Sequence, residues 1–271
     1  MSGKVLTVPL RATLILFTVL AVERSALAQT KAMPPSSLLS VTPFEDPLIE
    51  IAAYNPAFHS IFSGLLSRAE FSHLAKIAVV VTNRSSQTVD GLLVQWNVPR
   101  RGLGTKTHFL PIDRYSRYQQ QPVLGPSAQA LITPLGYITE DQIGTNLLTS
   151  ALSPMDALAD FYLVPTNITV SLDSVIWADG GVTGLDRFKI IDYIQARHAV
   201  ARSLAQRLPA QPWSDAALNR VLRTFVQEAA TNNQLSSHYR HWINVLAVSA
   251  RRGPNEINRL AAVSLPRLVS R

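Results

Sequence analysis

Two runs of β-forming residues on either side of a polar stretch are the feature that most constrains this fold. The runs are residues 77–82 and 92–98, and the polar stretch, residues 83–87, is "NRSSQ". In the second run every other residue is apolar, namely Leu92, Val94, Trp96 and Val98. This period of two is typical of a strand buried on one face. The sequence therefore predicts a β-hairpin, with Trp96 as a core aromatic between two sheets.

Further strands follow this predicted hairpin. Residues 125–136, "GPSAQALITPLG", predict a turn, a short strand and a proline stop. Residues 167–184 predict a long strand and then a turn at residues 178–181. With a shift of one residue along this strand, Val175 and Trp177 would continue its inward face, which begins with Ile168, Val170 and Leu172. Short strands separated by Gly, Pro and Asn are typical of an antiparallel immunoglobulin-like β-sandwich.

The C-terminal part predicts helices instead. A stripe of apolar residues ends at Pro209 and consists of Ile190, Ile194, Ala201, Leu204 and Leu208. Ser214 would cap a second helix, a third would end at residues 252–254, and Asn255 would begin a fourth. A short helix is also predicted after Asn55 and Pro56, with Phe58, Ile61, Phe62, Leu65 and Leu66 on one face. The expected fold class is α+β: an antiparallel immunoglobulin-like sandwich followed by a C-terminal helical region.

Three stretches carry a resemblance to known proteins. "VVVTNRSSQTVDGLLVQWNV" resembles the second-strand hairpin of immunoglobulin-like modules in exported bacterial proteins. The later stretches "GPSAQALITP" and "VSLDSVIWADGGVTGLD" are similar to downstream segments of uncharacterised secreted proteins of that kind. The resemblance covers roughly residues 74–186. It implies a sandwich with a helical tail and an exported protein, and it implies no catalytic residue.

The first 28 residues have the pattern of a signal peptide. Lys4 and Arg11 precede an uncharged apolar run at residues 12–22, and small residues at Ala26 and Ala28 place a cleavage site before Gln29. The run is shorter than the roughly 20 residues of a membrane-spanning helix, although a signal anchor stays an alternative. The chain contains no cysteine, which for an exported protein fits a bacterial envelope. We expect a periplasmic or extracellular protein without a transmembrane segment after cleavage near Ala28.

Charge divides the rest of the chain. Residues 29–185 hold 9 Lys/Arg and 12 Asp/Glu, whereas residues 186–271 hold 13 and 5. We therefore expect four segments: a signal peptide (1–28), an N-terminal segment with a short helix (29–73), a β-sandwich domain (74–185) and a basic helical region (186–271).

The basic region suggests an anionic partner, because arginine forms bidentate contacts with carboxylates and phosphates. The candidate face consists of Arg197, Arg202, Arg220, Arg223, Arg240, Arg251 and Arg252. The partner would be an acidic protein or an anionic component of the cell envelope. Nucleic acid is not expected, because export and the absence of a recognition motif argue against it. The sequence favours the simpler interpretation, in which these arginines form a solvated face of an arginine-rich region or dock onto the acidic β half.

No motif in the chain predicts catalysis, a metal or a cofactor. A thiol nucleophile is excluded, and no G-x-S-x-G elbow occurs. His238 and His241 lie three residues apart, but they fit the flank of an apolar helical stripe better than a metal site, and His198 fits a packed position. The acidic residues Asp173, Asp179 and Asp186 lack the spacing of a calcium loop.

Acidic pairs at Glu140/Asp141 and Asp156/Asp160 fit the first turns of short helices. A Ser–His–Asp triad assembled from distant positions stays open, because such triads leave no local pattern. The leading hypothesis is thus a non-enzymatic exported protein that acts in binding or assembly at the envelope. The alternative is a periplasmic hydrolase with an Asp/His site between the β and helical parts.

Overall fold

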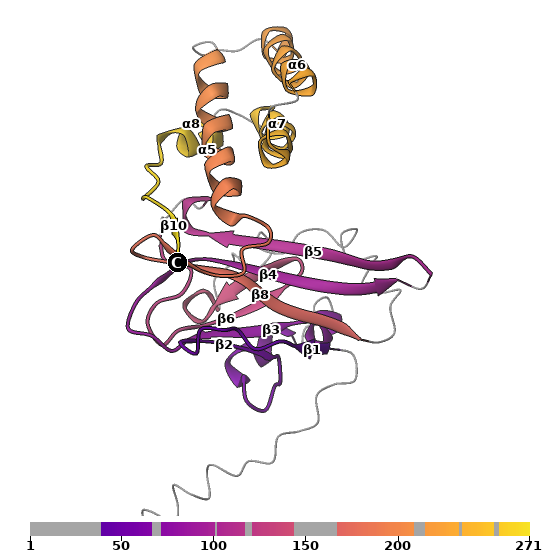
Figure 1. The fold of residues 1–271 in the computed structure, drawn as a ribbon, viewed down its shortest axis with the longest axis vertical. Helices are drawn as coiled ribbons and strands as arrows, with labels where there is room; N and C mark the ends of the chain where they lie inside the picture. Colours follow the sequence, from indigo (N-terminus) through magenta and orange to yellow (C-terminus); the bar gives the residue numbers. More distant parts are fainter. Residues whose placement is uncertain are drawn as a thin grey trace, which may run out of the picture. The chain divides into compact units, whose positions relative to one another are not determined.

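The computed structural model describes residues 39–66, 72–100, 102–116, 121–143, 167–208, 215–232, 235–251 and 255–271. Within these residues the chain is an α+β protein with ten strands in two sheets, and most of its helices lie in the C-terminal part (Figure 1). The predicted α+β class is therefore confirmed.

The two sheets differ in size and in strand direction. Sheet A has the order β10-β9-β8-β4-β5, with β1 also paired to β8, and consists of β1 (Leu39–Val41), β4 (Val89–Arg100), β5 (Gly104–Asp113), β8 (Ile168–Trp177), β9 (Gly181–Gly184) and β10 (Val269–Ser270). Sheet B has the order β2-β3-β6-β7 and consists of β2 (Ile49–Ala53), β3 (Val79–Asn83), β6 (Gln129–Thr133) and β7 (Gly136–Thr139). Sheet B is antiparallel, whereas sheet A is mixed because β1 and β10 pair in parallel.

The predicted hairpin around residues 83–87 is not a hairpin. Its two strands, β3 and β4, belong to different sheets, so the connection crosses from sheet B to sheet A. Asn83 is fully buried in this crossing, and its amide donates to the carbonyls of Gln87 (2.7 Å) and Gly125 (2.9 Å). Its Oδ1 accepts from the backbone N–H of Ser85. These bonds satisfy backbone C=O and N–H groups at the turn that do not pair with a neighbouring strand.

The core between the two sheets contains the alternating residues that the sequence pattern predicts. Trp96 is fully buried there, and its indole N–H donates to the carbonyl of Ile77 at 3.1 Å. The valines of β3 pack against the inward residues of β4 in the same cluster. The prediction of Trp96 as a core aromatic between two sheets is confirmed.

The predicted shift along β8 is a β-bulge. Leu172 pairs with Val94 and Ser174 pairs with Leu93, which leaves Asp173 as the extra residue. The extra residue explains why the inward-facing residues are even-numbered before the bulge and odd-numbered after it. The inward set, all in the core between the sheets, is Ile168, Val170, Leu172, Val175 and Trp177.

Sheet A is also covered on its second face. There Leu93 and Ile176 share a hydrophobic cluster with Ile190 and Ile194 of the first long helix and with Val263 near the C-terminus. The strand β4 is therefore buried on both faces along most of its length, and not on one face as its period of two suggests.

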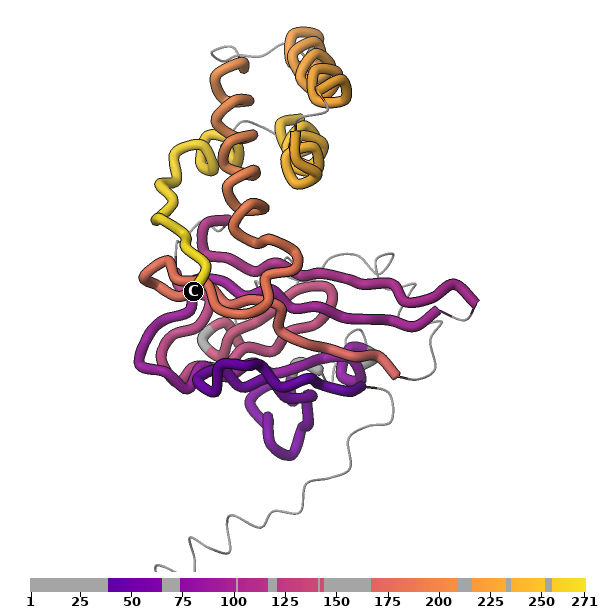
Figure 2. The backbone as a smooth tube through the Cα atoms, viewed as in Figure 1, coloured from indigo at the N-terminus to yellow at the C-terminus, as the bar shows by residue number. Residues whose placement is uncertain are grey.

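The helical region consists of α5 (Ile190–Arg207), α6 (Asp215–Thr231), α7 (Ser237–Ala250) and α8 (Asn255–Ala262), which share a core of their own. The backbone then returns to the β region, where β10 pairs with β9 (Figure 2). Ser236 caps α7 by accepting from Tyr239 N–H at 3.1 Å. The predicted start at Asn255 is confirmed, whereas Pro209, Ser214 and residues 252–254 lie outside the described residues.

Residues before β3 form more than a short helix. The structure has a 3₁₀ helix, η1 (Ser60–Phe62), followed by α2 (Ser63–Leu66) and a second 3₁₀ helix, η2 (Ser72–Lys76). Phe62 is buried, but Phe58 and Ile61 are about half exposed, so the predicted single apolar face is wrong for these residues. The tighter 3₁₀ geometry changes which side chains share a face. The remaining 3₁₀ helices are η3 (Arg114–Ser116) and η4 (Glu140–Gln142).

Candidate anion-binding groove in the helical region

The seven arginines of the predicted anionic-partner face have different environments. Exposed arginines are Arg202 on α5, Arg220 and Arg223 on α6, Arg240 on α7, and Arg251 directly after α7. Arg252 lies outside the described residues. Arg197 is only 2% exposed, so it does not belong to a solvent-facing surface.

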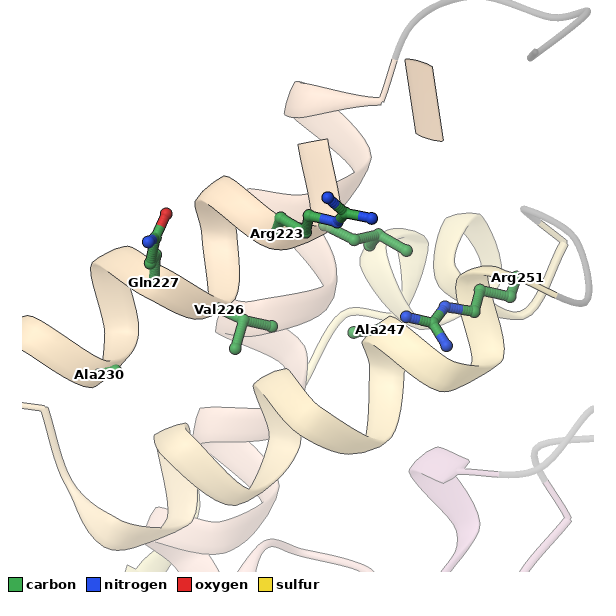
Figure 3. A pocket seen from close by; sticks show the side chains of 7 residues that line it. Arg223, Val226, Gln227, Ala230, Ala247 and Arg251 are labelled. Atoms are coloured by element: carbon green, nitrogen blue, oxygen red, sulfur yellow. The ribbon is translucent and has the colours of Figure 1, made fainter. Parts of the chain in front are cut away.

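Two of the exposed arginines, Arg223 and Arg251, lie at one groove between α6 and α7 (Figure 3). The groove has a volume of about 420 Å³ and is lined by Leu222, Arg223, Val226, Gln227, Ala230, Ala247 and Arg251. Most of its lining is apolar, and its charged groups are both cationic. This combination is typical of sites that hold a ligand by apolar contact and orient it by a few polar groups.

The positions of the lining residues follow from helical spacing. Leu222, Val226 and Ala230 recur every four residues along α6, so their side chains share one stripe. Ala247 on α7 and Arg251, the C-cap residue of α7, have the same spacing. Leu222 and Ala247 are buried and also belong to the core of the helical region, so the floor of the groove is continuous with that core.

The guanidinium groups of the groove have no acidic partner among the described residues. Glu228 on α6 pairs with Arg207 of α5 and not with Arg223. The sequence of α7 contains no acidic residue at all. Both arginines are therefore free to meet an anion from outside the described chain.

Arg197 has a different role, because it joins the helical region to sheet A. Its guanidinium donates two hydrogen bonds to Asp113 at the end of β5, at 2.9 Å and 2.6 Å. It also lies over the ring of Trp242, with its carbon 5.3 Å from the ring centroid. The bidentate pair and the aromatic contact compensate for burying the charge.

His198 completes this junction. Its Nδ1 lies 2.8 Å from the carbonyl of Leu260 on α8, which can only accept, so Nδ1 carries the proton. Its Nε2 faces the guanidinium of Arg197 at 3.5 Å. Burial, together with the neighbouring charge of Arg197, lowers the pKa of His198 to about 4. The predicted packed position of His198 is confirmed.

The histidines of α7 pack against aromatic rings. His238 Nε2 donates to the carbonyl of Phe188 at 2.8 Å, and its ring contacts those of Phe188 and Tyr193. His241 packs against Tyr193 and Trp242, and burial lowers its pKa. Within the described ranges, no group of three or more metal-ligating side chains is close enough to hold an ion.

The acidic residues near residues 173–186 stabilise turns and a helix start. Asp173 accepts from Phe188 N–H, and Asp186 accepts from Ile190 N–H at the start of α5. Asp179 accepts from Gly181 N–H in the turn before β9 and pairs with Arg271. Of the other acidic pairs, Glu140 begins η4, whereas the structure of Asp156 and Asp160 is outside the described residues.

Sequence reasoning missed the apolar lining of the groove. The recurrence of Leu222, Val226 and Ala230 on α6 was available as a signal, but core residues and groove residues share the same spacing. Comparisons with protein families, with curated proteins and with solved structures found no match for this chain. In the part of the chain that the structure describes, no helix has the length and apolar character needed to cross a membrane.

Proposed function

We propose that this chain is an exported, non-enzymatic protein of the bacterial cell envelope that binds an anionic partner through its helical region. The signal-peptide pattern of residues 1–28 supports export, and the absence of cysteine in an exported chain fits a bacterial envelope. The partner class is an acidic protein or an anionic envelope component.

The observation that carries this proposal is the groove between α6 and α7. Arg223 and Arg251 lie together at an apolar groove without an acidic partner among the described residues. Elsewhere Arg197, Arg207 and Arg271 do have carboxylate partners. Within the described ranges, carboxylates thus neutralise several arginines, whereas this pair has no such partner.

The β region serves as the scaffold in this proposal, and we assign it to the immunoglobulin-like type. Two sheets that share one core, with a connection crossing between them after Asn83, support that assignment. Helix α5 and the segment before β10 share one hydrophobic cluster with sheet A, and the pair of Arg197 with Asp113 also holds α5 there. A groove in such a region would be held in a defined place.

The hydrolase alternative receives less support. Asp113 and His198 do lie between the β and helical parts, but both are buried, at 3% and 0% exposure. The carboxylate of Asp113 is fully engaged by Arg197, and neither group is among the residues that line the groove. An acid or base must reach the substrate to catalyse, so this Asp/His pair does not fit the task.

Cross-linking in living bacteria tests the proposal. The full chain and the double variant R223Q/R251Q are expressed and purified with their bound partners under denaturing conditions. R202Q/R240Q is the matched control, because it removes the same charge at exposed positions outside the groove.

We expect a specific envelope partner that is captured by the wild type and by the control and is lost from R223Q/R251Q. Cell fractionation and N-terminal sequencing of the expressed protein itself, and not of its partner, test export, with Gln29 as the expected first residue. Capture of the same partner by R223Q/R251Q, or a chain that stays in the cytoplasm with its first 28 residues, would contradict the proposal.

A further inference from the structure

The groove between α6 and α7 has the proportions of a small-molecule site. Its lining on α6 extends from Leu222 to Ala230, which at 1.5 Å per residue is about 12 Å along the helix. Its volume of about 420 Å³ lies within the range of small-molecule pockets. A stable protein–protein interface buries about 800 Å² on each partner, so a ligand seated only in this groove would be smaller than a folded protein.

Charge in the groove is confined to one end. Figure 3 shows Arg223 of α6 and Arg251 at the C-terminal end of α7 near one end, whereas Ala230 and Gln227 lie towards the other. Between the two ends, the side chains of Val226 and Ala247 provide an apolar floor. A ligand that matches this arrangement has an anionic group at one end and an apolar body.

We propose that the groove binds a single-chain amphiphile with a carboxylate head group, of the fatty-acid type. The acyl chain lies along Val226 and Ala230, and the carboxylate meets Arg223 and Arg251. Two guanidinium groups match the two oxygens of a carboxylate, and such hydrogen bonds are stronger than neutral ones. A polyanionic sugar has no apolar part for the floor of the groove, and a neutral lipid leaves both arginines unpaired.

This inference rests on the proposed function, because it names the class of anionic envelope component that the same groove takes. It adds two requirements that anionic binding alone does not have. Affinity depends on the length of the acyl chain as well as on the charge, and it is lost when the apolar end of the groove is filled. Ala230 is exposed, so a larger side chain there fills the groove without disturbing the core.

The test is calorimetric titration of the mature chain (residues 29–271) with sodium dodecanoate below its micellar concentration. We expect saturable one-site binding, weakened at least tenfold by R223Q/R251Q and by A230F, and unchanged by R202Q/R240Q. Acetate, which has the head group alone, and dodecanol, which has the chain alone, are expected to bind at least tenfold more weakly. Circular dichroism of each variant establishes that the fold is retained.

Each alternative result overturns a defined part of the inference. Equal binding of dodecanol would remove the role of the arginines, and tighter binding of dodecyl phosphate would contradict the choice of a carboxylate. Absence of dodecanoate binding, with an envelope partner still lost from R223Q/R251Q in cells, would contradict the amphiphile inference but not the proposed function. Dodecanoate binding without any partner captured in cells would contradict the proposed function but not the amphiphile inference.

Discussion

At the scale of single residues, the ion pair between Asp113 and Arg197 joins two parts of the chain that are distant in sequence. The two residues are separated by 84 positions in the chain and are both almost fully buried. A buried pair of this kind contributes little net stability as a unit, but the loss of one partner leaves an uncompensated charge. The contact therefore fixes which part of α5 meets the end of β5.

The variant R197M tests this pair. Because it leaves the Asp113 carboxylate buried and unpaired, we expect it to lower the free energy of unfolding by about 3–5 kcal/mol. The double variant D113N/R197M removes both charges and is expected to recover part of that loss. Urea unfolding followed by tryptophan fluorescence measures both variants, and purely additive effects in the double variant would show that the pair is not coupled.

His198 predicts a dependence of stability on pH. Its pKa is about 4 in the folded chain, below the ordinary value of 6.5, so the unfolded chain binds the extra proton between these values. Stability is therefore complete above pH 6.5 and falls as the pH drops towards 4, by about 2–3 kcal/mol from this group. Other histidines with lowered pKa values, His59 and His241, add to the same trend.

The variant H198Q separates the contribution of His198. Gln cannot be protonated in this range and can still donate to the carbonyl of Leu260. Unfolding curves at pH 7, 5.5 and 4.5 should show a smaller loss of stability for the variant than for the wild type. An unchanged pH dependence would show that His198 does not titrate in this window.

At the scale of elements, the bulge in β8 depends on a close approach of β9. Gly184 pairs with Ser174, has a φ of +109°, and would place a Cβ atom 2.4 Å from the carbonyl oxygen of Asp173. Asp173 in turn accepts from Phe188 N–H shortly before α5. Local geometry at the bulge thus sets how the chain leaves sheet A and enters the helical region.

G184A is expected to destabilise the chain by about 1–3 kcal/mol, because the new methyl group meets backbone atoms that cannot rotate away. The matched control is G64A in α2, where an added Cβ has no atom within 4 Å and where helix propensity favours alanine. Thermal unfolding by circular dichroism compares the two. An equal effect at both positions would contradict the close-approach argument.

Some of these elements were predictable from the sequence and others were not. The sequence predicts a shift in β8, because its inward apolar residues are even-numbered up to Leu172 and odd-numbered from Val175, and the structure shows that this shift is a bulge. The crossing after Asn83 was not, because a polar turn between two strands does not specify whether they pair side by side or face each other. Strand β5 was missed because its first residues are mostly polar and exposed and Pro111 lies within it.

The candidate site shows the same limit. The arginines of the groove were predicted as a charged set, since composition alone marks the region as basic. The sequence could not separate the buried Arg197 from the exposed Arg202, because both lie on α5 and the partner of Arg197 is on β5. Nor could it pair Arg223 with Arg251, since the packing of α6 on α7 decides that.

At the scale of the whole molecule, sheet A is the middle layer. One face packs on sheet B, and the other packs on α5 and on the segment before β10. The opposite charges of the two halves meet directly at Asp113 with Arg197 and at Asp179 with Arg271. Docking of basic residues onto the acidic half therefore accounts for part of the charge division.

Deletion of residues 186–271 is consequently expected to destabilise the β region. It would expose Leu93 and Ile176, remove β10 and leave Asp113 unpaired. We expect the chain 29–185 to bind an apolar dye and to aggregate in size-exclusion chromatography, whereas R223Q/R251Q elutes as the wild type does. Cooperative unfolding of 29–185 at the wild-type temperature would contradict this, and point variants are the cleaner probe of the groove.

The return of the chain to β9 determines how the molecule would respond to a pull on its last residue. Val269 N–H donates to Gly180 and Arg271 N–H donates to Val182, and Arg271 also pairs with Asp179. Tension applied at Arg271 would therefore pass through these few bonds into β9 and sheet A, and would bypass α5–α8. The helices would carry load only after β10 has detached from β9. This short strand would therefore protect the region that holds the groove until its own hydrogen bonds break.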